Sequence, residues 1–359
     1  MLMSAWLVVV SSMGGGTARA QTPDDDVIDK IRGLASIPTP DQDRVDRWLR
    51  AKVEGIRRSG QPIPAEGFAT VFADFKSNFQ RSGDSDEFNA LLASKLAEIA
   101  AAELSQGEAS PVLAFALPRM MVELNRMETV PGLLGGLKAK SAVARLICAQ
   151  GLAKLRSAIA ASGEQLPDVV AALRAAGLAE QEPVVLARIY LALAYPANSV
   201  DVESAYLDIF DKRLAFRRGP AELADGAEVE AFEYFRTSGV LDQLNEEQQA
   251  ALVKRLAVFL RLDAQRYNDG RLAPPKDGNS VDFAFSERDV LERMLIANEA
   301  ILARVTKSSN RTITTELGGG GWKRRQAVLN AAYGWIGDPV TSTTGVLNAA
   351  PFGVELGAP

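Results

Sequence analysis

The sequence predicts an all-α protein in which helical hairpins stack into an α-α superhelix, or solenoid, with an irregular multi-helix bundle as the alternative. Three observations predict this fold class. Apolar residues recur at helical spacing along most of the chain, helix-start signals precede several of these segments, and no sustained period-two alternation indicates a sheet. Hydrophobic residues make up 47% of the chain, which is enough for a sizeable core.

Residues 1–20 predict a signal peptide. A mostly apolar run from Ala5 to Met13 is followed by glycines and then by Ala18-Arg19-Ala20, the small-residue pattern that a signal peptidase cleaves. Gln21 would then begin the mature chain. No Lys or Arg precedes the run, and a short buried N-terminal helix is the alternative. The run is far shorter than the ~20 apolar residues that span a membrane. We therefore expect export to the periplasm or the cell exterior, without a stable transmembrane anchor.

The region 21–128 predicts an N-terminal series of amphipathic helices. Thr39 is a candidate helix cap, and Gln42 stands where it would complete a capping box. Asp84 marks another helix start, and Ser110-Pro111 a third, because proline suits the first helical position. The expected helical segments are 24–37, 39–60, 68–79, 84–105 and 110–124.

One of these helices carries an aromatic stripe. Phe68, Phe72, Phe75 and Phe79 follow one another at spacings of four, three and four residues, which places their rings on one helical face. The stripe predicts a core face packed against neighbouring helices. The alternative is a groove for a partner helix or an acyl chain.

Two copies of one unit occur near the centre of the chain. Segment 130–137 resembles 166–173 at an offset of 36 residues, and segment 143–149 resembles 186–192 at an offset of 43. Each unit holds two helices, with small residues inside and an Arg early in the second helix. Residues 129–196 therefore resemble HEAT-type repeats. The resemblance implies an α-solenoid with an extended concave binding surface. It also implies an acidic residue in the turn between the paired helices, and the sequence offers no evident candidate for that residue.

Further helices of the repeat-like region 129–268 are expected at 202–216, 221–237 and 246–267. The segment 269–285 is predicted to be a loop.

Asp269-Gly270 suggests comparison with a calcium-binding EF-hand. With this pair at the fifth and sixth loop positions, however, Lys276 falls at the twelfth, where a glutamate is required. An ordinary loop is the better account. An irregular calcium site would use four aspartates: Asp263, Asp269, Asp277 and Asp282.

The region 286–336 predicts C-terminal helices, interrupted by a glycine-rich linker at 307–321. The run Gly318–Gly321 precedes a final helix, Trp322–Ile336, but it lacks the Gly-Lys-Ser/Thr of a phosphate-binding P-loop. A linker is therefore the better interpretation. Residues 337–359 carry little charge and many small side chains, and they predict a flexible tail.

The chain of 359 residues contains no histidine. This excludes every Ser-His-Asp or Cys-His catalytic arrangement and every zinc site that uses imidazole. The single cysteine, Cys148, stands in an apolar helix and is expected to be a buried packing residue. Forty Lys and Arg against 45 Asp and Glu give a net charge of −5, which argues against a general nucleic-acid-binding protein.

These observations predict an exported, non-enzymatic helical scaffold that binds another protein. No catalytic residue and no cofactor is nominated. Two other classes remain open. One is a carbohydrate-active hydrolase or lyase on a helical toroid, because such enzymes can work with two carboxylates alone. The other is a carrier for a lipid or another apolar ligand, which would use the Phe68–Phe79 stripe.

Overall fold

The computed structural model describes residues 25–58, 81, 83–105, 110–195, 201–218, 226–237, 239–270 and 287–356. Throughout these ranges helices dominate, and they contain no strand beyond an isolated bridge between Asp338 and Thr343. The all-α prediction is confirmed. The predicted signal peptide, 1–20, and the stripe Phe68–Phe79 lie outside the described residues.

The α-helices follow the predicted segments closely in the middle of the chain. They are α1 (Asp25–Ile31), α2 (Thr39–Arg58), α4 (Asp86–Ser105), α5 (Pro111–Leu124), α6 (Val130–Gly136), α7 (Ala142–Ser162), α8 (Leu166–Ala179), α9 (Pro183–Leu193), α10 (Val202–Arg217), α11 (Val229–Thr237), α12 (Glu246–Asp269), α13 (Glu287–Val305), α14 (Thr312–Gly318) and α15 (Arg325–Ile336). In the described part of the chain, none of them is both long enough and apolar enough to cross a bilayer.

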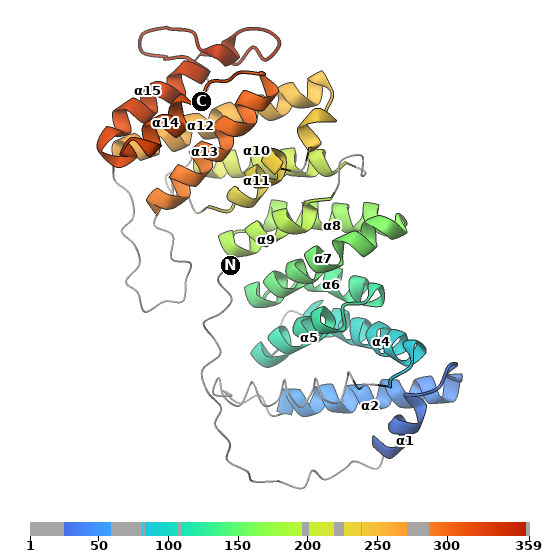
Figure 1. The fold of residues 1–359 in the computed structure, drawn as a ribbon. Helices are drawn as coiled ribbons and strands as arrows, with labels where there is room; N and C mark the ends of the chain where they lie inside the picture. The colour runs from blue at the N-terminus through green and yellow to red at the C-terminus, as the bar shows by residue number, and fades with distance from the viewer. Residues whose placement is uncertain are drawn as a thin grey trace.

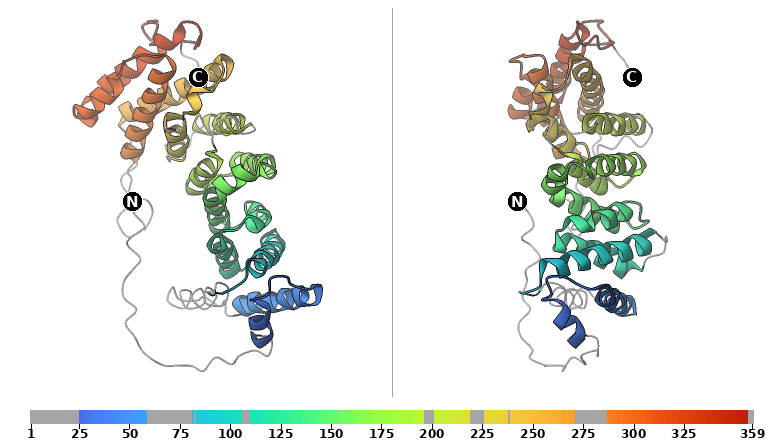
Figure 2. Two further views of the ribbon diagram at one scale, coloured as in Figure 1. Left: turned by 45° about the vertical axis from the view of Figure 1, so that its right-hand side comes forward. Right: turned by 90° about the vertical axis from the view of Figure 1, so that its right-hand side faces the viewer.

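The helices form an elongated stack that runs from α1 at one end to α15 at the other (Figure 1). Between α4 and α13 they make two rows. In one row α4, α6, α8, α10 and α12 contact each other in succession, and in the other α5, α7, α9, α11 and α13 do so. The stack is curved, with the second row on the inner side of the curve (Figure 2). We call the first row the outer row and the second the inner row.

Glycines let neighbouring helices of the stack approach closely. A Cβ on Gly132 of α6 would stand 2.7 Å from the Ala97 Cα of α4, and one on Gly136 would stand 2.2 Å from the Cys148 Sγ of α7. A Cβ on Gly177 of α8 would meet Ile209 of α10 at 2.4 Å. Since real Cβ atoms essentially never approach other atoms this closely, a larger residue at these positions would force the neighbouring atoms to shift.

Two predicted helix starts differ in detail from the structure. At the start of α4 the Ser85 hydroxyl accepts the Phe88 N–H, while Asp84 turns away to receive a 2.8 Å hydrogen bond from Arg32. At the start of α2, Gln42 donates to the Ile37 carbonyl rather than closing a capping box. The third start is as expected, because the Ser110 hydroxyl accepts the Leu113 N–H.

The predicted linker 307–321 contains a helix. Residues Thr312–Gly318 form α14, and the buried carboxylate of Glu299 on α13 accepts the N–H groups of Ile313 and Thr314, both at 2.8 Å. The Trp335 indole donates to the same carboxylate at 3.3 Å. A buried acid on another helix thus satisfies the N-terminal amides of α14, which no local sequence pattern could reveal.

The described part of the predicted tail, 337–356, also differs from the expectation. Leu347 is fully buried, and the side-chain amide of Asn348 donates to the carbonyls of Ile336 and Val354. The segment packs against the end of α15, which supplies the apolar contacts that its own composition lacks. A low-charge segment therefore acquires a fixed path from its neighbours.

Candidate functional site

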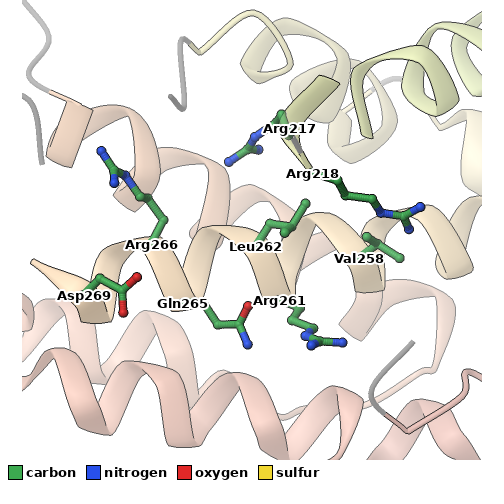
Figure 3. Close-up of a pocket in the computed structure, with 8 residues that line it drawn as sticks. All are labelled: Arg217, Arg218, Val258, Arg261, Leu262, Gln265, Arg266 and Asp269. Atoms are coloured by element: carbon green, nitrogen blue, oxygen red, sulfur yellow. The ribbon is translucent and has the colours of Figure 1, made fainter. Parts of the chain in front are cut away.

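A cavity of about 350 Å³ lies between the C-terminal end of α10 and the outward side of α12 (Figure 3). Half of the lining residues that the structure describes are arginines, and two others form an apolar wall. The lining residues are Arg217, Arg218, Val258, Arg261, Leu262, Gln265, Arg266 and Asp269.

Helical spacing on α12 explains this lining. Val258, Leu262 and Arg266 are each four residues apart, so they follow one side of the helix. In Figure 3 these three side chains extend toward the end of α10, from which Arg217 and Arg218 approach. Arg261 and Gln265 extend from the other edge of α12, and Asp269 lies at its exposed end.

Arg217 is held by a buried partner. Its Nη2 donates to the Asp263 Oδ1 at 2.5 Å, and the two side chains are only 2% and 0% exposed. Burial raises the pKa of Asp263 to about 6, with Arg217 opposing that rise and Glu228 adding to it. The pair therefore fixes the Arg217 guanidinium at the cavity wall. Removing the Asp263 carboxylate from water is unfavourable and opposes this arrangement.

Two more ion pairs surround this one. Arg213 of α10 donates to the fully buried Glu228 at 2.5 Å, just before α11. Arg266 donates to both oxygens of Glu287, the first residue of α13, at 2.9 and 3.2 Å. The cavity thus adjoins a junction at which buried charges, rather than apolar contacts alone, join α10, α11, α12 and α13.

The chemistry available in this cavity is recognition of an anion. Guanidinium groups stay protonated and offer N–H donors in a planar fork that matches carboxylate and phosphate groups. Among the described residues of the lining there is one carboxylate, Asp269, and no cysteine, serine, threonine, tyrosine or lysine. Cys148 is buried on α7, outside this lining, and burial raises the pKa of its thiol.

The structure does not bring the calcium candidates together where it describes them. Asp263 faces the interior against Arg217, whereas Asp269 is exposed at the end of α12. Asp277 and Asp282 lie outside the described residues. In the ranges that the structure describes, no group of three or more His, Cys, Asp or Glu side chains could hold a metal ion.

Sequence reasoning missed the arginines of the cavity. Arg261 and Arg266 lie on a helix that was predicted from its apolar side, and Arg217-Arg218 ends another helix. The one available signal was the concentration of Arg at these two places. The pairing of Arg217 with Asp263, 46 residues away, follows only from the packing of α10 against α12.

An acidic residue in the turn of the second hairpin was also missed. Glu180, between α8 and α9, receives both a 2.7 Å bond from Arg145 Nε and a 2.8 Å bond from Arg145 Nη2. Its carboxylate also accepts the N–H groups of Gln181 and Glu182. Burial raises the pKa of Glu180, but Arg145 and these two amides outweigh that effect and lower it. Arg145 starts the second helix of the first unit, so this contact joins the two units.

No protein-family model, curated protein or solved structure matches the chain. The geometry of the stack and of the cavity therefore carries the functional argument.

Proposed function

We propose that the protein is an exported helical scaffold of the HEAT-type solenoid class that binds another protein along its inner row. The single observation that carries this proposal is the pair of continuous rows from α4 to α13. Such a stack buries the surface between its rows and leaves the far side of each row open as an extended surface.

The side of α9 that faces away from the core illustrates the binding surface. Val184, Arg188 and Leu191 follow one another at helical spacing, and none of them is fully buried. Here two apolar side chains flank an arginine, and arginine is enriched at surfaces that recognise another protein.

Polar contacts hold the inner row in a fixed curve. Lys154 of α7 donates to the Val122 carbonyl of α5 at 3.0 Å, and Arg156 of α7 donates to the Leu191 carbonyl of α9 at 2.9 Å. α7 is thereby linked to both of its neighbours in the row. A surface that is rigid before binding loses less entropy when a partner docks.

The two alternative classes receive less support. A glycosidase needs two carboxylates that face one cleft, whereas the residues described along the cavity include one, Asp269. The carrier hypothesis depends on the Phe68–Phe79 stripe, which lies outside the described residues.

The proposal is tested by chemical cross-linking of the full chain in its native extract, followed by mass spectrometry. Two charge reversals serve as a matched pair: Arg188→Glu on α9 in the inner row, and Lys212→Glu, exposed on α10 in the outer row. We expect one stoichiometric protein partner whose cross-links map to α5, α7, α9 and α11. Arg188→Glu should weaken its capture at least about tenfold, while Lys212→Glu should leave it unchanged.

Two results would overturn the proposal. One is a partner whose cross-links map to the outer row and whose capture is weakened by Lys212→Glu alone. The other is a folded, correctly exported protein that captures no stoichiometric protein partner at native abundance.

A further inference from the structure

We propose that the cavity between α10 and α12 binds a small organic anion. Its phosphate or carboxylate group would be held by the arginines, and its apolar part would rest on Val258 and Leu262. This inference concerns the outer row, and it does not depend on protein binding along the inner row.

Charge favours an anionic ligand. Four of the eight described residues that line the cavity are arginines, and Asp269 is the acid among these eight. Asp263 and Glu287, which pair with Arg217 and Arg266, are not among these described lining residues. The described lining therefore concentrates guanidinium groups in a chain whose overall charge is −5.

The arginines are positioned before a ligand arrives. The carboxylate of Asp263 fixes Arg217, which is 96% buried and still contributes to the cavity wall. Glu287 holds Arg266 through two hydrogen bonds. Donors that are already oriented cost a ligand less ordering entropy, and a poorly solvated guanidinium attracts an oxyanion more strongly than an exposed one does.

The size and the apolar wall favour an organic anion over an inorganic one. A volume of about 350 Å³ falls within the range of small-molecule sites and exceeds what a single phosphate ion fills. Val258 and Leu262 offer an apolar surface between Arg218 and Arg266 (Figure 3). A ligand with an oxyanion at one end and a compact apolar body would use both features.

Isothermal titration calorimetry of the full chain tests this proposal with three probes: phenyl phosphate, benzoate and inorganic phosphate. We expect phenyl phosphate or benzoate to bind at one site per chain, at least about tenfold more tightly than inorganic phosphate. The tighter of the two identifies the oxyanion as phosphate or carboxylate.

Variants locate the site. Arg218 is exposed, so Arg218→Gln should preserve the fold while it weakens binding of the tighter probe about tenfold. Arg218→Lys keeps the charge but loses the planar guanidinium fork. Its affinity for the probe should therefore lie between those of the wild type and Arg218→Gln. Lys254→Gln removes an exposed charge from α12 outside the lining, and it should change affinity less than about twofold.

Three outcomes would refute the proposal. The first is the absence of saturable binding of phenyl phosphate and benzoate at millimolar concentration. The second is equal affinity for inorganic phosphate, which would remove any role for the apolar wall. The third is equal weakening by Arg218→Gln and Lys254→Gln, which would indicate diffuse charge attraction instead of a site.

Discussion

The hairpins α6 to α9 and the block α10 to α13 are both helical, but different interactions hold them together. In the first region, glycines such as Gly132 and Gly136 let α6 pack closely against α4 and α7. In the second, buried ion pairs join the helices beside a cluster of aromatic side chains. The members of this second set are Arg213–Glu228, Arg217–Asp263, Arg266–Glu287 and the rings of Tyr206, Phe210, Phe232, Phe235 and Phe259.

This difference separates a region held by close packing from a region held by charges. Close packing around glycine stabilises one geometry and leaves no room for a ligand. Buried ion pairs contribute little net stability, since each charge must first lose its water. Their concentration beside the cavity of α10 and α12 therefore needs another explanation, and the positioning of Arg217 and Arg266 for a ligand supplies one.

The largest expected effect comes from breaking a buried pair. Asp263→Ala leaves the Arg217 charge buried without its carboxylate, and it should lower the free energy of unfolding by about 3–5 kcal/mol. Urea denaturation measures this loss. The double variant Arg217→Met with Asp263→Leu should recover most of it, because two apolar side chains need no solvation. A double variant as unstable as Asp263→Ala would show that the pair itself stabilises the block.

A smaller loss is expected in the hairpins. Gly132→Ala places a methyl group 2.7 Å from the Ala97 Cα, and backbone cannot yield as a flexible side chain does. We expect a loss of about 1–3 kcal/mol in thermal or urea unfolding. Gly55→Ala is the matched control, because a Cβ there meets nothing within 4 Å in α2. It should stabilise the chain by about 0.5–1 kcal/mol. Equal effects of the two substitutions would contradict the close approach of α4 and α6.

The contact between the two repeat-like units should contribute less. Glu180→Gln weakens the bonds from Arg145 and should cost about 1.5 kcal/mol at neutral pH. Because the pKa of Glu180 is lowered in the folded chain, its contribution is present above the unfolded-state pKa and is lost as the pH falls through the folded value. The stabilities of wild type and Glu180→Gln should therefore converge in acid. A constant difference at every pH would contradict this assignment.

A pH dependence of opposite sign is expected in the second region. The pKa of Asp263 rises from 3.8 to about 6 on folding. The folded chain therefore holds the carboxyl proton of Asp263 more strongly than the unfolded chain does. The part of the stability that depends on protonation of Asp263 is therefore fully present below the unfolded pKa and is lost as the pH rises through about 6, while the ion pair with Arg217 remains. Urea denaturation of wild type and Asp263→Asn, at pH values between the unfolded and the folded pKa of Asp263, measures this change in the free energy of unfolding. A wild type that gains stability relative to Asp263→Asn over this interval would contradict the assignment.

Most of the fold could be predicted from the sequence because helical periodicity is a local property. The apolar side of α12 predicted a helix at 246–267, and the structure has it at Glu246–Asp269. Elements that depend on distant partners could not be predicted this way. α14 owes its N-terminal hydrogen bonds to Glu299, and the described tail owes its order to burial of Leu347.

The residues of the candidate site could not be predicted from the sequence for the same reason. Its arginines lie at the end of α10 and along α12, and only the packing of these two helices makes them neighbours. From the sequence, Asp263 is considered only as one ligand of an irregular calcium site, and an ordinary loop is preferred to that site. A carboxylate and a guanidinium that are 46 residues apart give no local pattern, so the buried pair of Asp263 with Arg217 could not be anticipated.

Hydrogen–deuterium exchange of the full chain tests the contrast between the two regions most directly, with and without a saturating concentration of whichever of phenyl phosphate and benzoate binds more tightly. We predict that the ligand slows exchange in peptides from the end of α10 and from α12, and leaves the peptides of α6 to α9 unchanged. Slowed exchange centred on α6 to α9, or no change anywhere at saturation, would contradict the assignment of the ligand site to the charged block.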